Sequence, residues 1–202
     1  MTRYPQDLEQ AIAFHGHLCP GLLIGYRAAK IGLSRLGSQR SQDEELIAIV
    51  ENNSCAADAV QVLTGATFGK GNFFFRDHGK QVFTFALRPS GKGGSGKRGR
   101  AGSGERGRAG SGERGRAVRV ALKAGAFLPG VSREERSQRL LSASNEELFT
   151  IEEKIIELPP EAEIRKSVIC DNCGEQVMDT LTRRVKGRVL CIPCAEKAKI
   201  KK

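Results

Sequence analysis

Two pairs of cysteines near the C-terminus constrain this 202-residue chain more than any other feature. Two residues separate the thiols in each pair, and seventeen residues separate the pairs. The four cysteines are Cys170, Cys173, Cys191 and Cys194. A two-residue spacing lets one tight turn direct both sulfur atoms at a single ion, so two such pairs complete a tetrahedral zinc site. Because four thiolates leave no open coordination position, we predict a structural zinc in a treble-clef or ribbon finger over residues 165–202.

The rest of the composition bears on the compartment of the protein. The chain has only six cysteines, which is few for a disulfide scaffold of this length. No apolar run approaches the roughly 18 residues that a membrane helix needs, and no secretory signal pattern is present at the start. We therefore expect a cytoplasmic protein that does not associate with membranes.

The net charge of +10 is concentrated in one repetitive segment. Residues 91–116 contain the repeat GRAGSGER and eleven glycines, and eight basic against two acidic residues give this segment a net charge of +6. Without large apolar side chains it buries too little to offset its backbone entropy, so we predict a flexible loop. Strand-like sequences at 81–88 and 117–122 flank it, so the loop would expand a hairpin inside a first domain, residues 1–160.

Hydrophobic periodicity predicts that this first domain is an α+β domain in which helices accompany a sheet. A near-continuous apolar run at 46–51 is typical of a strand buried on both faces. The turn signal DHGK at 77–80 would join two further strands. The expected helices are 6–13, 20–36, 55–64, 132–144 and 145–156, and the expected strands are 46–51, 72–76, 81–88 and 117–122.

The remaining thiols fall at the predicted starts of two helices. Pro20 suits the first turn of the helix at 20–36, which puts Cys19 at its N-cap. Cys55 opens the helix at 55–64 directly after the buried strand. Unpaired amides and the helix dipole favour a thiolate at such positions.

Two histidines precede the first of these thiols. In an extended segment, the alternation of His15, His17 and Cys19 would put three ligands on one side of the chain. With Cys55 arriving from the neighbouring helix, we predict an open site for zinc or another transition metal on His17, Cys19 and Cys55. Whether His15 is a further ligand is left open.

Other interpretations of these residues stay open. Taken alone, each cysteine is as consistent with an inert core residue as with a metal ligand. Cys55 could instead be a nucleophile with His17 as its base and Asp58 or Asn53 orienting the base, and Cys19 and Cys55 could be a redox pair.

Two lysines around the following loop are candidates for binding an anion. Lys70 and Lys80 would place positive charge near the metal and hold an anionic substrate, although a solvated surface explains them as well. If the metal does chemistry, Cys55 and His17 would be the catalytic residues and the metal would activate an oxygen atom.

Three segments together resemble the FmdE family, the E-subunit family of formylmethanofuran dehydrogenase. They are FHGHLCPGLLIGYRA from Phe14, IVENNSCAADAVQVLTGATFGKGNFFFRDHGKQVFTF from Ile49, and CDNCGE with CIPC in the finger. The resemblance implies a thioredoxin-like α+β N-terminal domain with a mixed sheet and flanking helices, a treble-clef finger and a homodimer. It also implies a metal that maps to His17, Cys19 and Cys55. The chain departs from many relatives by carrying Ala66 in place of a cysteine and by its glycine-rich repeat.

These observations lead to one functional hypothesis and one alternative. The resemblance implies a metal-binding protein that is an accessory or metal-delivering subunit of a molybdenum or tungsten redox enzyme. The alternative is a regulatory module whose finger and basic loop bind nucleic acid or a protein partner. The sequence alone does not decide whether the chain is itself an enzyme.

Overall fold

The computed structural model describes residues 4–89 and 112–200. Its contacts divide the chain into two units, the first ending at Ala162 and the second beginning at Glu163. Within the described ranges, no helix combines the length and the hydropathy that crossing a membrane requires. Most of the glycine-rich repeat falls outside these ranges, so the predicted flexibility of residues 91–111 stays a prediction.

The first unit is built on a five-stranded mixed sheet with the strand order β2-β1-β3-β4-β5. The strands are β1 (Leu46–Val50), β2 (Phe73–Phe75), β3 (Val82–Leu87), β4 (Arg114–Leu122) and β5 (Phe149–Glu157). Strand β2 pairs with β1 in parallel, and every other neighbouring pair is antiparallel. All five residues of β1 are buried, as the continuous apolar run predicted. The predicted α+β class with a mixed sheet is therefore confirmed.

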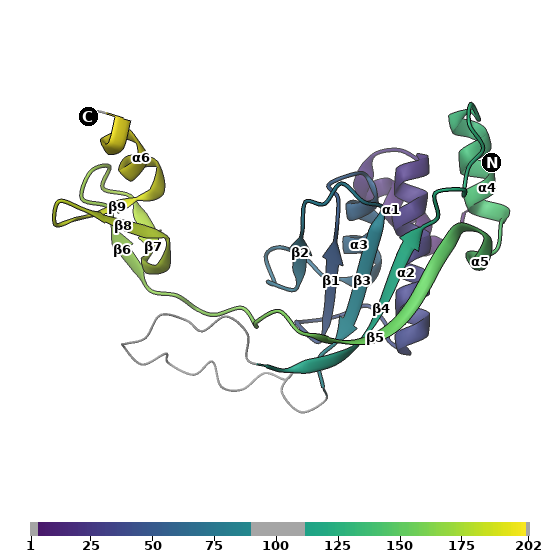
Figure 1. The fold of residues 1–202 in the computed structure, drawn as a ribbon, viewed down its shortest axis with the longest axis horizontal. Helices are drawn as coiled ribbons and strands as arrows, with labels where there is room; N and C mark the ends of the chain where they lie inside the picture. The colour runs from purple at the N-terminus through teal and green to yellow at the C-terminus, as the bar shows by residue number, and fades with distance from the viewer. Residues whose placement is uncertain (1–3, 90–111, 201–202) are drawn as a thin grey trace. The chain divides into compact units, whose positions relative to one another are not determined.

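Three helices cover one side of this sheet (Figure 1). They are α1 (Gln6–His15), α2 (Pro20–Leu36) and α3 (Ala56–Thr64). Helix α2 begins with proline in its first turn and ends at Gly37, and α3 ends at Gly65; both glycines adopt the left-handed conformation that closes a helix. Buried leucines of α2 pack with Phe83 and Phe85 of β3 in one hydrophobic core.

Helices α2 and α3 approach each other more closely than ordinary side chains allow. A Cβ added to Gly25 would lie 2.1 Å from the carbonyl oxygen of Ala56 and 2.6 Å from its Cα. Only glycine fits at such a separation, so Gly25 fixes the start of α3 against the first half of α2. This crossing positions the functional residues described below.

The turn at residues 77–80 joins two strands, as predicted, but these strands do not form a hairpin. Strands β2 and β3 are not neighbours, because β1 lies between them, parallel to one and antiparallel to the other. The loop instead folds over the end of β1, where the amides of His78 and Lys80 donate to the carbonyl of Glu51. Turn residues alone did not specify pairing, because β2 and β3 each pair with the buried strand β1 and not with each other.

The helix predicted over 145–156 is wrong. After α4 (Arg133–Ser142), a single helical turn, α5 (Asn145–Leu148), is followed by strand β5, which pairs with β4 over nine residues. The capping box of Ser144 and Glu147 supports the first turn. Beyond it, Thr150, Ile151 and the two later isoleucines favour an extended chain, and the open edge of β4 supplies the partner.

The β3–β4 pairing confirms the predicted hairpin that the repeat expands, with Ala86 opposite Ala117. However, β4 begins at Arg114, so the last residues of the repeat are strand and not loop. At Gly115 a Cβ would meet the carbonyl oxygen of Leu87 at 2.3 Å, so the repeat contributes a glycine that this close strand contact requires.

The second unit consists of two short hairpins and a terminal helix. Its elements are β6 (Ser167–Ile169), β7 (Gln176–Met178), a 3-10 turn (Asp179–Leu181), β8 (Thr182–Val185), β9 (Arg188–Cys191) and α6 (Ile192–Ile200). Both residues of the β8–β9 turn, Lys186 and Gly187, have positive φ, which suits a two-residue hairpin.

Candidate metal centres

The four cysteines of the second unit form a compact thiol group. The sulfur atoms of Cys170, Cys173, Cys191 and Cys194 all lie within 4.8 Å of one another. Cys170 and Cys191 are buried, together with Leu190 and Ala195, in the small core of this unit. Four sulfur atoms this close are the donor set of a closed tetrahedral zinc site.

Polar groups around these sulfur atoms favour the thiolate form of Cys170. At Cys173 and Cys191 the backbone amides are outweighed by burial and the neighbouring thiols, which raise the pKa of Cys173 to about 12 and also raise that of Cys191. The amide of Cys191 donates to the sulfur of Cys170 at 3.3 Å, and Nδ2 of Asn172 donates to the sulfur of Cys194 at 3.3 Å. Backbone amides of Cys173, Cys191 and Asn172 lower the pKa of Cys170 to about 6. Because the thiolate is the form that binds zinc, the residues present fit the ion.

A second group of donors lies at the junction of α1 and α2. Ring nitrogens of His15 and His17 and the sulfur of Cys19 lie within 4.8 Å of one another, and the two imidazole centroids are 4.7 Å apart. Cys19 is buried, His15 is partly buried and His17 is exposed. The group therefore opens to solvent on the side of His17.

The local backbone differs from the extended lead-in that the sequence suggested. His15 is the last residue of α1, and Gly16 ends that helix with a φ of 99°. The chain then reverses into α2, where Cys19 is the N-cap and its sulfur accepts the amide of Leu22 at 3.4 Å. The predicted N-cap position of Cys19 is confirmed, whereas His15 reaches the group from the end of a helix.

Asp58 holds one of the imidazoles from the first turn of α3. Its Oδ2 lies 2.7 Å from Nδ1 of His15, and Nε2 of the same ring lies 3.8 Å from the sulfur of Cys19. An acceptor at Nδ1 fixes the proton there and leaves Nε2 free to act as a ligand on the side of the thiol. Asp58 thus contacts His15 and not His17, the base that it would orient in the alternative with Cys55 as a nucleophile.

Cys55 lies beside this group and is not part of it. The predicted ligands were His17, Cys19 and Cys55. The three donors that lie close together are His15, His17 and Cys19. The sulfur of Cys55 lies 3.6 Å from the point that a Cβ on Gly21 would occupy, and the sulfur of Cys19 lies 3.9 Å from the same point. Burial and then the neighbouring thiol of Cys19 raise the pKa of Cys55. A ligand or catalytic role for Cys55 stays a prediction.

The two candidate anion-binding lysines lie at different ends of the sheet. Nζ of Lys70 donates to the carbonyls of Ser41 and Gln42 at 3.3 Å each, beyond the C-terminal end of α3. Since α3 has nine residues, about 13 Å of helix separates that end from Cys55. Lys80 is exposed at the other end, near the end of β1, where its carbonyl accepts from Nδ2 of Asn52. Lys70 therefore lies away from the donors, and anion binding by Lys80 stays a prediction.

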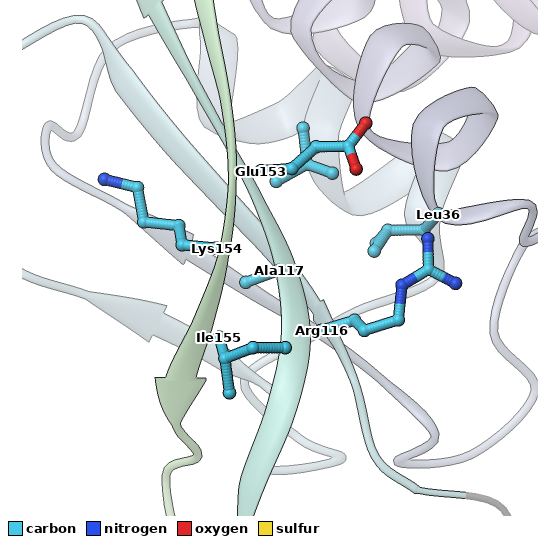
Figure 2. A pocket seen from close by; sticks show the side chains of 7 residues that line it. Leu36, Arg116, Ala117, Glu153, Lys154 and Ile155 are labelled. Carbon is cyan, nitrogen blue, oxygen red and sulfur yellow. The ribbon is translucent and has the colours of Figure 1, made fainter.

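A separate pocket of about 230 Å³ lies over β4 and β5 (Figure 2). Its lining residues are Leu36, Arg116, Ala117, Val118, Glu153, Lys154 and Ile155. None of them is a cysteine or a histidine, so the pocket is distinct from both groups of metal donors.

The comparisons with known proteins agree with this organisation. Residues 14–165 match the family model described as FmdE, molybdenum formylmethanofuran dehydrogenase operon, and residues 164–199 match the prokaryotic dksA/traR C4-type zinc finger. The zinc-finger match and the four-cysteine group together support zinc as the ion of the second unit.

Two similar proteins extend the comparison. A protein of Archaeoglobus fulgidus named a probable S-adenosyl-L-methionine-binding protein is 32% identical over 197 residues, which are 93% of this chain and 52% of that relative. The chain thus spans about half the length of this relative. A crystal structure of an FmdE-like protein of the tungsten formylmethanofuran dehydrogenase type, from Syntrophus aciditrophicus, has a TM-score of 0.62 and 22% identity, covers 95% of this chain and 91% of that chain, and supports the fold.

The predicted resemblance is confirmed, because the first family model extends over most of the chain. The chain is a metal-binding protein that belongs to the FmdE family and ends in a C4-type zinc finger.

Proposed function

We propose that His15, His17 and Cys19 hold a transition-metal ion in the first unit. The observation that carries this proposal is the gathering of three donors within 4.8 Å, one of them already oriented by a carboxylate. Imidazole with thiolate is a donor set suited to zinc, copper, iron or nickel. Asp58 would act on the ion through His15, as carboxylates do for many histidine ligands.

The two donor groups are suited to different tasks. Four thiolates around one ion leave no position for another molecule, so the finger has a structural role. Three donors leave a position open, and an ion there can accept an oxygen, nitrogen or sulfur atom from a substrate or a partner. Because His17 is exposed, that position is reached from solvent, which suits exchange of the ion as well as catalysis.

We further propose that the chain is an accessory or metal-delivering subunit of a redox enzyme. The family description, which refers to a molybdenum formylmethanofuran dehydrogenase operon, supports this role, as does the solvent-facing donor group. An ion held for delivery must leave more readily than the structural zinc. Three donors with an exposed histidine provide that difference in a single chain.

Metal content per chain tests the site. Protein purified without oxygen should contain two ions, and Cys19→Ser should contain one. His78→Ala is a matched control, because His78 pairs with Glu51 and is outside the donor group. The control should keep two ions. One ion in the wild type, or two in Cys19→Ser, would refute the proposed site.

The delivery role makes a separate prediction about the rate of transfer. A chromogenic chelator should remove the ion of the first unit quickly and the zinc of the finger slowly. His17→Ala should accelerate only the fast phase. The finger should keep its zinc throughout the fast phase. Loss of both ions in a single phase, with the finger unfolding, would argue against a delivery role while leaving the site itself intact.

A second candidate function rests on the β8–β9 hairpin of the finger. Arg183, Arg184, Lys186 and Arg188 are exposed, and no ion pair among the described residues includes them. Such a cluster can contact nucleic-acid phosphates. Affinity for a short DNA duplex should then fall steeply between about 50 and 200 mM salt, and further in Arg184→Glu. Equal DNA affinity of the wild type and Arg184→Glu at low salt would exclude this function.

A further inference from the structure

The two thiols of the first unit lie beside the same glycine, Gly21. The sulfur atoms of Cys19 and Cys55 lie 3.9 Å and 3.6 Å from the position of an absent Cβ on Gly21. Cys19 begins α2 and Cys55 begins α3, so the starts of two helices bring the thiols together. Any side chain at residue 21 would be in contact with both sulfur atoms.

The close helix crossing keeps this arrangement in place. Gly25 lies one helical turn after Gly21 and is in direct contact with the backbone of Ala56, the residue after Cys55. The two helix starts therefore cannot separate without breaking a buried contact. Cys55 is left beside the donor group with Cys19 as its neighbouring thiol, while Cys19 itself is one of the three donors.

We propose that Cys19 and Cys55 close into a reversible disulfide that withdraws Cys19 from the metal site. The regulatory consequence rests on the proposed metal site; the disulfide does not. Cys55 is the more exposed thiol, so it is the first to meet an oxidant. A disulfide sulfur is no longer a thiolate, so the ion would be left with two imidazole donors and its affinity would fall.

The reaction balances with a small-molecule disulfide, such as oxidised glutathione, as the oxidant. The sulfur of Cys55 attacks it, forms a mixed disulfide and releases one glutathione thiol. The sulfur of Cys19 then attacks the Cys55 sulfur and releases the second glutathione thiol. The two protein sulfur atoms lose two electrons in total, and the oxidant gains them. Cys55 gives up one proton, and the second comes from the Cys19 thiol or, where Cys19 is bound to the ion as a thiolate, from solvent. Reduction by excess thiol reverses both steps.

Peptide mapping of the whole, metal-loaded protein tests the disulfide directly. After treatment with oxidised glutathione and alkylation, mass spectrometry should find a peptide that links Cys19 to Cys55, with one ion released for each disulfide formed. The finger should keep its zinc. Linkage of the finger cysteines alone, or no link between Cys19 and Cys55, would overturn the inference.

Two variants separate this inference from the proposed site. Cys55→Ser should keep both ions and lose the oxidative release, whereas loss of an ion from this variant before oxidation would make Cys55 a ligand and overturn the switch. Gly21→Ala places a methyl group 3.1 Å from Cβ of Cys55 and against both sulfur atoms, and it should slow closure about tenfold. If the wild type holds only the zinc of the finger, the proposed site fails, and the linked peptide still decides whether the disulfide forms.

Discussion

Replacing Asp58 by alanine should weaken metal binding in the first unit without removing a ligand. The carboxylate of Asp58 accepts Nδ1–H of His15 at 2.7 Å, which fixes the tautomer and directs Nε2 toward Cys19. Without this acceptor the ring is free to rotate, and its proton can reside on either nitrogen. A ligand atom that must first be oriented binds its ion more weakly.

The exposure of the pair sets the size of the effect. Loss of a carboxylate that supports a histidine ligand typically costs 10–100-fold in metal affinity, or about 1.4–2.7 kcal/mol. The side chain of Asp58 is 36% exposed, so solvent screens its charge, and we expect the lower end, about tenfold. Asp58→Asn keeps an oxygen that can accept the hydrogen bond but loses the charge, so its affinity should lie between those of wild type and Asp58→Ala.

The assay is a competition for Co²⁺ between the protein and a chromogenic chelator, followed through the visible absorption of the thiolate-bound ion. Glu51→Ala is the matched control, because Glu51 contacts His78 in the same kind of pair at 3.1 Å and is outside the donor group. Its affinity should equal that of wild type. Equal affinities for Asp58→Ala and wild type would refute the orienting role, and an equal loss in both variants would point to a general effect on folding.

Two further predictions concern stability. Gly25→Ala would bring a methyl group against the backbone of Ala56 and should lower the free energy of unfolding by about 1–3 kcal/mol in urea, whereas Gly69→Ala, with open space around it, should change it little. Partial burial works to raise the pKa of Asp7, but hydrogen bonds from Lys30 and Tyr26 outweigh it and lower that pKa below 3.8. The stability from this contact is present above the unfolded pKa of Asp7 and is lost as pH falls through its lowered folded pKa. The free energy of unfolding of Asp7→Asn, measured in urea, should therefore decrease less in acid than that of the wild type.

Local signals predicted α1, α2 and α3 because the ends of these helices depend on neighbouring residues. Proline in the first turn of α2 and the left-handed Gly37 after it act within a few residues, as does Gly65 after α3. The sequence therefore indicates these bounds closely. The finger was predictable for the same reason, since its ligand spacing is itself local.

Strand pairing was less predictable because it depends on distant partners. The alternation of apolar and polar residues at Phe149–Glu157 is weak, and the turn before this segment, α5, has a helix-capping signal. The segment is nevertheless a strand, because the open edge of β4 pairs with it. In the same way, β2 and β3 are adjacent along the chain but both pair with β1. Turn chemistry marks where the chain bends and does not specify which strands become neighbours.

The N-terminal donors were only partly predictable. The spacing of His15, His17 and Cys19 identified the thiol and both imidazoles, but the selection of His15 depends on how α1 ends at Gly16. The contact with Asp58 depends on where α3 lies against α1 and α2, which no local pattern contains. A carboxylate three residues after Cys55, on the first turn of the same helix, was the available signal.

Helix α2 contains three glycines at positions where neighbouring elements approach its backbone closely. Gly21 leaves room for the two thiols, Gly25 admits the backbone of α3, and Gly32 lies against the ring of Phe85, where a Cβ would come within 2.2 Å. Each costs about 1 kcal/mol of helix propensity relative to alanine. The helix tolerates these costs because close packing on the sheet and on α3 offsets them. Since the same contacts bring Asp58 to His15 and Cys55 to Cys19, the geometry of the metal donors and the stability of this packing should change together.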